Sequence, residues 1–230
     1  MAVAADVTKE KLGLADSVYQ GLVKTVEIVI HVSPFPPVQA IFQLISRRHG
    51  RSISRLASFR LRIRSKASQV DGDRSQADDT GTRNLIDLVR NSPSGTSRFH
   101  FCSSIASVLG GPASAQDEIT ETPSSDPATA SPIGYSQSKW VVERICEMAN
   151  QVTDMSGRVH VMRIGQLCGD TAIGYWNEKE GWPLLIRTVQ TTGTLPDLTD
   201  VCLLSTLVPY KNADEQEPSW LPVDLAAQTM

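Results

Sequence analysis

Three short apolar runs separated by helical patterns constrain the fold of this chain more than any other feature. Each run is rich in β-branched or aromatic residues and has the length of a buried strand; they are residues 26–31, 98–103 and 159–164. Between them, residues 81–90 and 135–150 place apolar side chains every three or four positions, as in helices that bury one side. Strands that alternate with helices in this way predict an α/β fold with a parallel sheet and right-handed crossovers.

Weaker patterns extend this organisation toward both ends of the chain. Residues 12–22 and 183–192 have the spacing of short helices, and residues 220–226 read as a short strand that turns into a helix. At 230 residues the chain is long enough for one α/β domain with a full core. We therefore expect a single domain over residues 1–230.

Composition excludes several classes of function. The net charge is −3, from 22 basic and 25 acidic residues, so nothing global indicates a nucleic-acid or membrane partner. No apolar run reaches the length of a membrane span, and the first residues lack a signal-peptide pattern. The four cysteines and four histidines have no paired spacing for a metal. We expect a reduced, cytoplasmic protein without a metal site.

A tyrosine and a lysine lie one helical turn apart at the start of the segment 135–150. Tyr135 and Lys139 therefore share one face of the helix, where the ammonium should lower the pKa of the phenol. A phenol tuned in this way can pass a proton to a carbonyl oxygen near neutral pH. The preceding strand ends in Ser103 and Ser104, whose hydroxyls can bond the same oxygen. These residues indicate the active site of a carbonyl reductase.

The same Tyr-x-x-x-Lys spacing occurs a second time, at Tyr175 and Lys179. This copy lies between two glycines and follows no strand that ends in serine, so we expect it to form a loop. The alternative for Tyr135 and Lys139 is a solvated pair on a helix face. The strand, the serines and the amphipathic helix around them favour the catalytic interpretation.

Two segments do not fit the alternating pattern. Residues 32–70 contain no acidic residue and carry eight Arg or Lys, and residues 199–217 break a helical region with an apolar run and then a charged one. The first can be a solvated basic loop or a nucleic-acid patch, although few aromatic residues interleave its charges. We favour a third interpretation, in which residues 32–79 and 199–218 are irregular insertions outside the main sheet, for instance translated non-coding sequence.

These motifs together resemble the extended short-chain dehydrogenase/reductase superfamily. More narrowly, the chain resembles the thioester reductase domains of nonribosomal peptide synthetases and adenylate-forming reductases, with a NAD-binding domain of the male sterility type. The residues that carry the resemblance are Asp6-Val7, Val29-Ile30-His31, Gly81-Thr82-Arg83-Asn84-Leu85, Ser103-Ser104, Tyr135-x-x-x-Lys139, residues 163–170, Trp182-Pro183-Leu184 and residues 220–224.

The resemblance implies a role for each matching residue. Tyr135 would donate a proton, Ser104 would bond the carbonyl oxygen, and Lys139 would contact the nicotinamide ribose beside Tyr135. Ser104 is preferred to Ser103 because it is the third residue after the aromatic residue of the strand. Asp6 would reach the adenine of the cofactor, and His31 would lie at the cofactor site.

The resemblance also implies the reaction. The substrate would be an acyl thioester on a phosphopantetheinyl carrier protein, reduced to an aldehyde with NADPH. A sugar-nucleotide epimerase or dehydratase on the same fold is an enzymatic alternative. Residues 165–169, Trp182 and Trp220 favour the thioester reductase.

One departure from the family pattern bears on cofactor binding. Dinucleotide folds open with a strand and a Gly-x-x-Gly-x-x-Gly turn whose backbone approaches the pyrophosphate, and this chain contains no such motif. We therefore expect a partial Rossmann-like, doubly wound parallel sheet that lacks the first βα units, in a truncated reductase domain. NADPH binding by this chain alone should be weak or absent. A non-catalytic fragment of such a domain is the alternative to an enzyme.

Overall fold

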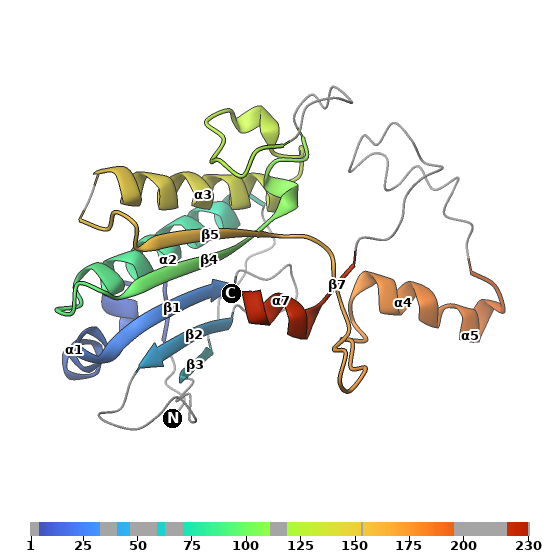
Figure 1. The fold of residues 1–230 in the computed structure, drawn as a ribbon, viewed down its shortest axis with the longest axis horizontal. Helices are drawn as coiled ribbons and strands as arrows, with labels where there is room; N and C mark the ends of the chain where they lie inside the picture. The colour runs from blue at the N-terminus through green and yellow to red at the C-terminus, as the bar shows by residue number, and fades with distance from the viewer. Residues whose placement is uncertain are drawn as a thin grey trace. The chain divides into compact units, whose positions relative to one another are not determined.

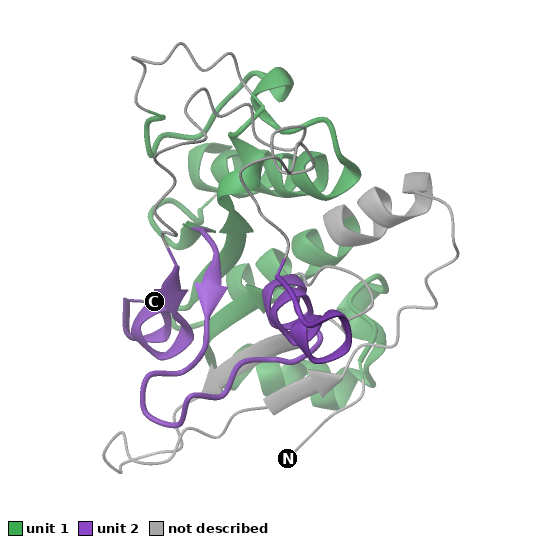
Figure 2. Ribbon diagram, turned by 90° about the vertical axis from the view of Figure 1, so that its right-hand side faces the viewer, with its two compact units in different colours: residues 1–112, 118–163 green, residues 113–117, 164–230 purple. Residues whose placement is uncertain are grey.

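The chain divides into two compact units, which Figure 2 shows in different colours. The first comprises residues 1–112 and 118–163, and the second comprises residues 113–117 and 164–230. The structure is a computed structural model. It describes residues 5–32, 41–46, 59–62, 71–110, 119–152, 154–195 and 220–229, with the backbone alone described at 41–46, 59–62 and 71–79.

A five-stranded sheet forms the centre of the first unit, in the order β3-β2-β1-β4-β5. The three strands expected from the apolar runs are β1 (Val26–Val32), β4 (Arg98–Ser104) and β5 (Val159–Ile164). β1 and β4 pair in parallel, and β5 lies beside β4 and runs in the same direction (Figure 1). The predicted α/β fold class with parallel strands is therefore confirmed.

Helices α2 (Asp71–Arg90) and α3 (Gly134–Val152) lie against one face of this sheet (Figure 1). Their apolar side chains fill the core together with alternate residues of β1 and β4; fully buried members are Val29, Leu85, Leu88, Val89, Phe99, Phe101, Val142 and Cys146. Burial of each such side chain contributes about 1.5–3 kcal/mol to stability. Both predicted helices are present, although α2 begins ten residues before the expected start because its first half is polar and shows no helical periodicity.

The helix expected over residues 12–22 lies partly elsewhere. A 3-10 turn, η1 (Glu10–Gly13), is followed by α1 (Asp16–Thr25). Lys11 and Leu12 have positive φ angles of 51° and 59°, so the backbone cannot continue one helix through them. Leu12 is nevertheless fully buried, which explains why its apolar character matched a helical pattern.

The sheet continues beyond β1 with two strands from the segment expected to lie outside it. β2 (Ile41–Ser46) pairs antiparallel with β1, and β3 (Phe59–Arg62) pairs antiparallel with β2. The expectation that residues 32–79 lie outside the main sheet is therefore wrong at these strands. The expectation rested on the basic charge of the segment. Its strands can nevertheless join the edge of the sheet, because antiparallel pairing needs no crossover helix. Residues 33–40, 47–58, 63–70 and 196–219, which include the second expected insertion, lie outside the described residues.

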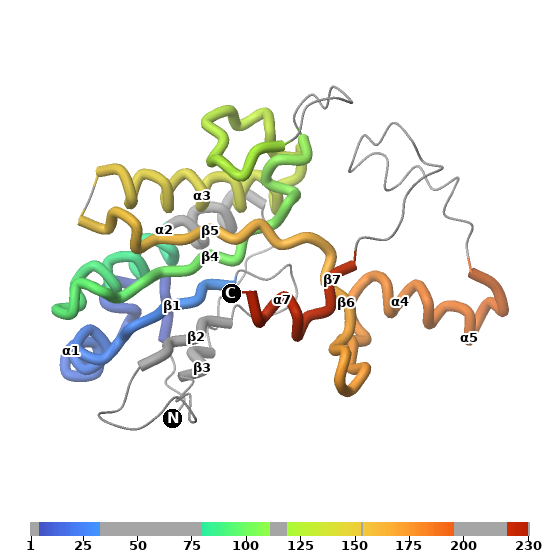
Figure 3. The backbone as a smooth tube through the Cα atoms, viewed as in Figure 1, coloured from blue at the N-terminus to red at the C-terminus, as the bar shows by residue number. Residues whose placement is uncertain are grey.

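The second unit contains a small parallel sheet and short helices. β6 (Leu167–Cys168) pairs with β7 (Leu221–Pro222), and Figure 3 shows the backbone of β7 running directly into α7 (Val223–Thr229), as the sequence predicts. The helix expected over residues 183–192 is divided at Thr188 into α4 (Gly181–Arg187) and α5 (Val189–Thr192). No helix among the described residues is long and apolar enough to cross a membrane.

Candidate active site

Ser104 is the last residue of β4, at the carboxyl end of the parallel strands. It also caps the 3-10 turn η2 (Ile105–Ser107), because the Ala106 N–H donates to Ser104 Oγ over 3.2 Å. Ser107 Oγ in turn donates to the carbonyl oxygen of Ser104 over 2.8 Å. The hydroxyl of Ser104 is thus held in a tight turn, and the residue is half-buried rather than enclosed.

Tyr135 and Lys139 lie one turn apart at the start of α3. Lys139 is 3% exposed, and its Nζ donates to the carbonyl oxygen of Cys102 in β4 over 2.8 Å. The same Nζ lies 4.8 Å from the ring centroid of Phe101 and 5.6 Å from that of Tyr135. An ammonium at these distances from two aromatic rings gains cation–π attraction, which offsets part of the cost of burying its charge.

The Ser104 hydroxyl lies close enough to the Tyr135 phenol to lower its pKa by hydrogen bonding. The structure thus places Lys139 beside Tyr135 on α3 and against β4, the strand that ends in Ser104. Burial raises the pKa of the Tyr135 phenol above its ordinary value, and the hydrogen bond with Ser104 acts in the opposite direction. The net shift is upward, so the expected lowering of the Tyr135 pKa by Lys139 is not found here, and the phenol keeps its proton at neutral pH.

Contacts between the two ends of the β4–α3 connection hold Ser104 near the start of α3. Gly110 N–H donates to the carbonyl oxygen of Thr129 over 2.7 Å, at the end of η3 (Pro127–Thr129), and Ser131 N–H donates to that of Ala106 over 3.2 Å. The backbones approach so closely that a Cβ added to Gly110 would lie 2.1 Å from the Ala130 oxygen. Only glycine fits at this crossing, which fixes where α3 begins relative to β4.

His31, expected at the cofactor site, lies near the carboxyl end of β1 and is 2% exposed. Its Nδ1 is 3.2 Å from the hydroxyl of Thr82, and its ring packs against those of Phe99 and Phe101 at centroid distances of 6.2 and 5.4 Å. Burial, and to a lesser degree the positive charge of Lys139, lowers the pKa of His31 to about 3. The structure thus places a neutral His31 in the core, where it supports the strand ends.

Asp6, expected to reach the adenine, bonds to its own loop. Its Oδ1 accepts hydrogen bonds from the backbone N–H and the hydroxyl of Thr8, at 3.1 and 2.6 Å. Asn84 fixes this loop to α2, since its Nδ2 donates to the carbonyl oxygens of Val7 and Lys9. Asp6 therefore has a defined position in unit one, but Ser104, Tyr135 and Lys139 are the residues that the structure brings into contact.

Sequence reasoning missed a buried carboxylate beside this group. Glu143, one turn after Lys139 on α3, is 3% exposed and forms an ion pair with Arg163 of β5, with 2.8 Å between Arg163 Nη2 and Glu143 Oε2. The sequence carries a signal for this residue. Glu143 lies four residues after Lys139, as Lys139 lies four residues after Tyr135, so an acidic residue interrupts the apolar face of the helix.

The second Tyr-x-x-x-Lys sequence lies in turns and irregular backbone of the second unit, as expected. Tyr175 is 66% exposed, and Lys179 is also exposed. In the part of the chain that the structure describes, no three His, Cys, Asp or Glu side chains form a group that could hold a metal ion. The polar groups of the candidate site are the Ser104 hydroxyl, the Tyr135 phenol and the Lys139 ammonium.

Comparison with known proteins agrees with this geometry. A sequence model of the NAD-binding family described as Male sterility protein matches residues 73–230. The chain is 36% identical over 151 residues to the non-ribosomal peptide synthetase ascB of Acremonium egyptiacum, which covers 64% of this chain and 12% of that protein. It is 29% identical over 195 residues to the adenylate-forming reductase Nps11 of Serpula lacrymans, with 84% and 14% covered. The chain thus spans only a small part of the length of these relatives.

The fold is similar to that of a solved structure described as the terminal R domain from the myxalamid PKS-NRPS biosynthetic pathway. The TM-score is 0.58 at 19% sequence identity, over 84% of this chain and 40% of that one. At this identity the likeness concerns the fold alone. The sequence match over residues 73–230 covers more than half of the chain and includes Ser104, Tyr135 and Lys139, and on that match the chain belongs to the NAD-binding family described as Male sterility protein.

Proposed function

We propose that this chain is a thioester reductase domain that uses a nicotinamide cofactor, taken to be NADPH, to reduce an acyl thioester on a phosphopantetheinyl carrier protein to an aldehyde. The observation that carries the proposal is the buried Lys139 ammonium, which lies 5.6 Å from the ring centroid of Tyr135 and is bonded to the strand that ends in Ser104. Membership of an NAD-binding family implies the class of cofactor. The printed names of the relatives, a peptide synthetase and an adenylate-forming reductase, support the class of substrate.

The residues present fit the nicotinamide end of such a cofactor. Tyr135 and Ser104 are half-buried hydroxyl groups, and Lys139 is a cation beside them, so together they offer donors to ribose hydroxyls and to a carbonyl oxygen. Bound cofactor supplies the hydride that adds to the thioester carbonyl carbon. The pyrophosphate end is different, because the sequence contains no glycine-rich turn of the dinucleotide-binding type.

Tyr135 acts as the general acid in this scheme. Its phenol is protonated at neutral pH because burial raises its pKa, so it can give a proton to the carbonyl oxygen as negative charge develops there. Ser104 donates a hydrogen bond to the same oxygen. The resulting hemithioacetal then collapses, its hydroxyl proton passes to the leaving sulfur, and an aldehyde and a free thiol are released.

Lys139 orients the Tyr135 phenol and compensates the negative charge that forms on it. It does not contact the substrate carbonyl. Its ammonium, anchored on the Cys102 carbonyl oxygen, lies 5.6 Å from the ring centroid of Tyr135. When the phenol has given up its proton, this cation stabilises the phenolate that remains. Asp6 would add a contact to the adenine, and His31, buried near the carboxyl end of β1, would lie at the cofactor site.

A second candidate is a non-catalytic fragment of such a domain. The observation that favours it is the missing glycine turn, because free N–H groups at a helix N-terminus are the main binding site for a pyrophosphate. The few remaining contacts would have to offset the cost of immobilising a large, charged ligand. We therefore propose that residues 1–230 alone bind NADPH weakly or not at all.

The test measures NADPH binding by nicotinamide fluorescence, first with residues 1–230 and then with the chain extended upstream by a strand and a Gly-x-x-Gly-x-x-Gly turn. The extended protein should bind NADPH and convert an acyl-pantetheine thioester into an aldehyde and a free thiol. Binding without reduction would refute the thioester reductase. Micromolar affinity of residues 1–230 would show that the glycine turn is dispensable.

A further inference from the structure

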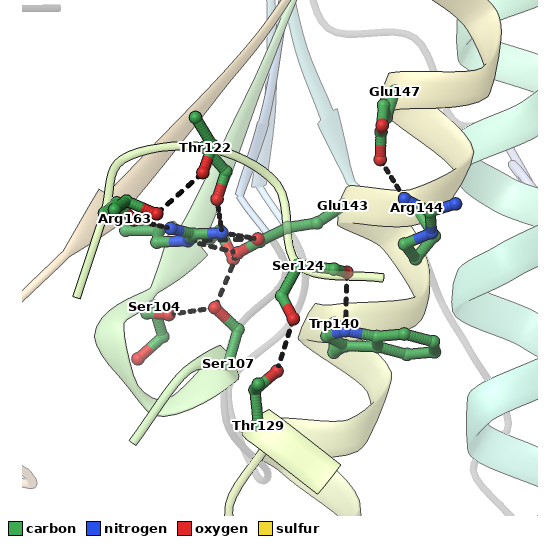
Figure 4. A network of polar contacts seen from close by, with 12 residues as sticks. Ser104, Ser107, Thr122, Ser124, Thr129, Trp140, Glu143, Arg144, Glu147 and Arg163 are labelled. Carbon is green, nitrogen blue, oxygen red and sulfur yellow. Dashed lines mark hydrogen bonds and ion pairs between the residues drawn. The ribbon is translucent and has the colours of Figure 1, made fainter. Parts of the chain in front are cut away.

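Glu143 accepts hydrogen bonds from two serines, one before and one after Ser104 in the sequence. Ser104 is the residue that we propose to bond the substrate carbonyl oxygen. Ser103 Oγ, immediately before Ser104, donates to Glu143 Oε1. Ser107 Oγ, at the end of η2, lies 2.6 Å from the same oxygen (Figure 4). Ser107 Oγ is also 2.8 Å from the carbonyl oxygen of Ser104, so its one proton lies between two acceptors. The carboxylate is thereby connected to the backbone of Ser104 itself.

Arg163 holds the other side of the carboxylate. Its Nε and Nη2 donate to Glu143 Oε2 over 3.0 and 2.8 Å, and its side chain is 14% exposed. The same guanidinium donates to the carbonyl oxygens of Thr120 and Thr122, over 3.1 and 3.2 Å, in the connection that leads to α3. Figure 4 shows these groups converging on Glu143 from three parts of the chain.

Every polar group that faces this carboxylate is a donor. A buried charge in such a setting is stable only while all of its partners remain in place, so the network has one favourable arrangement. Replacement of the carboxylate by an amide would direct N–H groups toward donors and leave Arg163 or the serines unsatisfied. The geometry of the Ser104 turn is therefore tied to the charge and the length of the Glu143 side chain.

We propose that Glu143 is a positioning residue that fixes the Ser104 hydroxyl against the Tyr135 phenol, acting through Ser103 and Ser107 and held in place by Arg163. Glu143 lies on the same face of α3 as Tyr135 and Lys139, at successive intervals of one turn. One helix thus carries the proton donor, the cation and the group that places the partner hydroxyl. Only the catalytic role of Ser104 in this inference rests on the proposed function. The claim that Glu143 positions Ser104 concerns the structure of the chain by itself.

The experiment reads the Ser104–Tyr135 contact directly and needs neither cofactor nor substrate. Tyrosine labelled with ¹³C at Cζ is titrated by NMR, the Tyr135 signal is identified with Tyr135→Phe, and circular dichroism follows folding at each pH. Ser104→Ala should raise the pKa of Tyr135, because the hydrogen bond with Ser104 lowers it. Glu143→Gln should raise it by at least half as much, and adding Glu143→Gln to Ser104→Ala should change nothing further.

Two more variants keep the test decisive. Ser107→Ala removes the hydroxyl that contacts both Glu143 and the Ser104 carbonyl oxygen, and it should raise the pKa of Tyr135 in the same direction even where Glu143→Gln does not fold. Glu147→Gln, one turn further along α3 and paired with Arg144, is the matched control and should leave Tyr135 unchanged. The proposal is overturned if Ser104→Ala leaves the titration of Tyr135 unaltered. It is also overturned if Ser104→Ala shifts the titration while folded Glu143→Gln and Ser107→Ala do not. Absence of reductase activity would bear on the proposed function and not on this result.

Discussion

Two Tyr-x-x-x-Lys sequences in this chain lie in opposite surroundings. Tyr135 and Lys139 belong to a helix packed on the central sheet, and the lysine is 3% exposed and bonded to the Cys102 carbonyl oxygen. Tyr175 is 66% exposed and lies with Lys179 in turns of the second unit. The spacing alone thus has no chemical meaning. A phenol becomes a candidate acid where a strand end supplies a hydroxyl and a helix supplies a buried cation.

The carboxylates near the two sequences differ in the same way. Glu143 is buried and bonded to Ser103, Ser107 and Arg163. Glu178, between Tyr175 and Lys179, forms an exposed pair with Arg187 at 3.7 Å, with side-chain exposures of 72% and 61%. Exposed pairs contribute little because solvent screens them, whereas a buried carboxylate stabilises its neighbours only as part of a complete network. The following comparisons test whether this contrast governs activity and stability.

The largest difference is expected for activity. Tyr135→Phe removes the proton donor while keeping the ring, and in the extended protein described above it should lower kcat for thioester reduction by about 10²–10⁴-fold. Tyr175→Phe should leave kcat unchanged, since that hydroxyl is exposed in a loop. Aldehyde formation under single-turnover conditions checks both variants. Equal losses in the two would show that the exposed copy is the functional one.

Stability should separate the two carboxylates. Glu143→Ala leaves the Arg163 charge without its carboxylate and the Ser103 hydroxyl without its acceptor in a buried site, at a cost of about 3–5 kcal/mol in the free energy of unfolding. Glu178→Ala should change it by less than about 0.5 kcal/mol. Urea unfolding followed by circular dichroism measures both. If Glu143→Ala were as mild as Glu178→Ala, the network around Glu143 would not be a unit of the fold.

Acid should weaken the first unit before the second. His31 has a pKa of about 3 in the folded chain and about 6.5 when unfolded, and burial also lowers the pKa of His100 and His160, beside Arg98. As the pH falls below 6.5, the unfolded chain binds protons that the folded chain excludes, so stability is lost toward pH 3. His31 alone accounts for about 2 kcal/mol by pH 5.

Residues 164–230 contain no histidine, so this loss should be confined to signals from the first unit. Urea unfolding at pH 7 and at pH 5 should therefore show a smaller pH dependence in His31→Leu than in the unchanged chain. The pH dependence, rather than absolute stability, is the quantity compared, because the substitution also changes packing. An unaltered pH dependence in His31→Leu would mean that His31 is not held neutral by burial.

The sequence predicted those parts of the molecule whose physical cause is local. The strands β1, β4 and β5 contribute buried apolar residues to the core that they share with α2 and α3, and α3 repeats its apolar residues at helical spacing. Ser104 and Tyr135 were found for the same reason, since each lies at an end of one of these elements.

Other parts depend on contacts between distant residues and were not predicted. β2 and β3 join the sheet through antiparallel pairing with β1, while the composition of their segment indicated a basic insertion. The partner of Glu143 in α3 is Arg163, twenty residues away on strand β5, and no local pattern links the two. The upward shift in the pKa of Tyr135 was missed because burial, which the sequence does not show, outweighs the neighbouring charge.

The smallest expected difference concerns two threonines. Thr82 is fully buried in α2 with its hydroxyl 3.2 Å from His31 Nδ1, whereas Thr191 in α5 is exposed and bonds only to its own helix, at the Thr188 carbonyl oxygen. Valine keeps the shape and the β-branch, so Thr→Val isolates the hydroxyl.

Thr82→Val should cost about 1–2 kcal/mol in the free energy of unfolding, because the buried imidazole loses a partner. Thr191→Val should cost less than about 0.5 kcal/mol, since water replaces the lost bond. Urea unfolding resolves a difference of this size, and equal costs at the two positions would show that the Thr82–His31 contact does not support the end of β1.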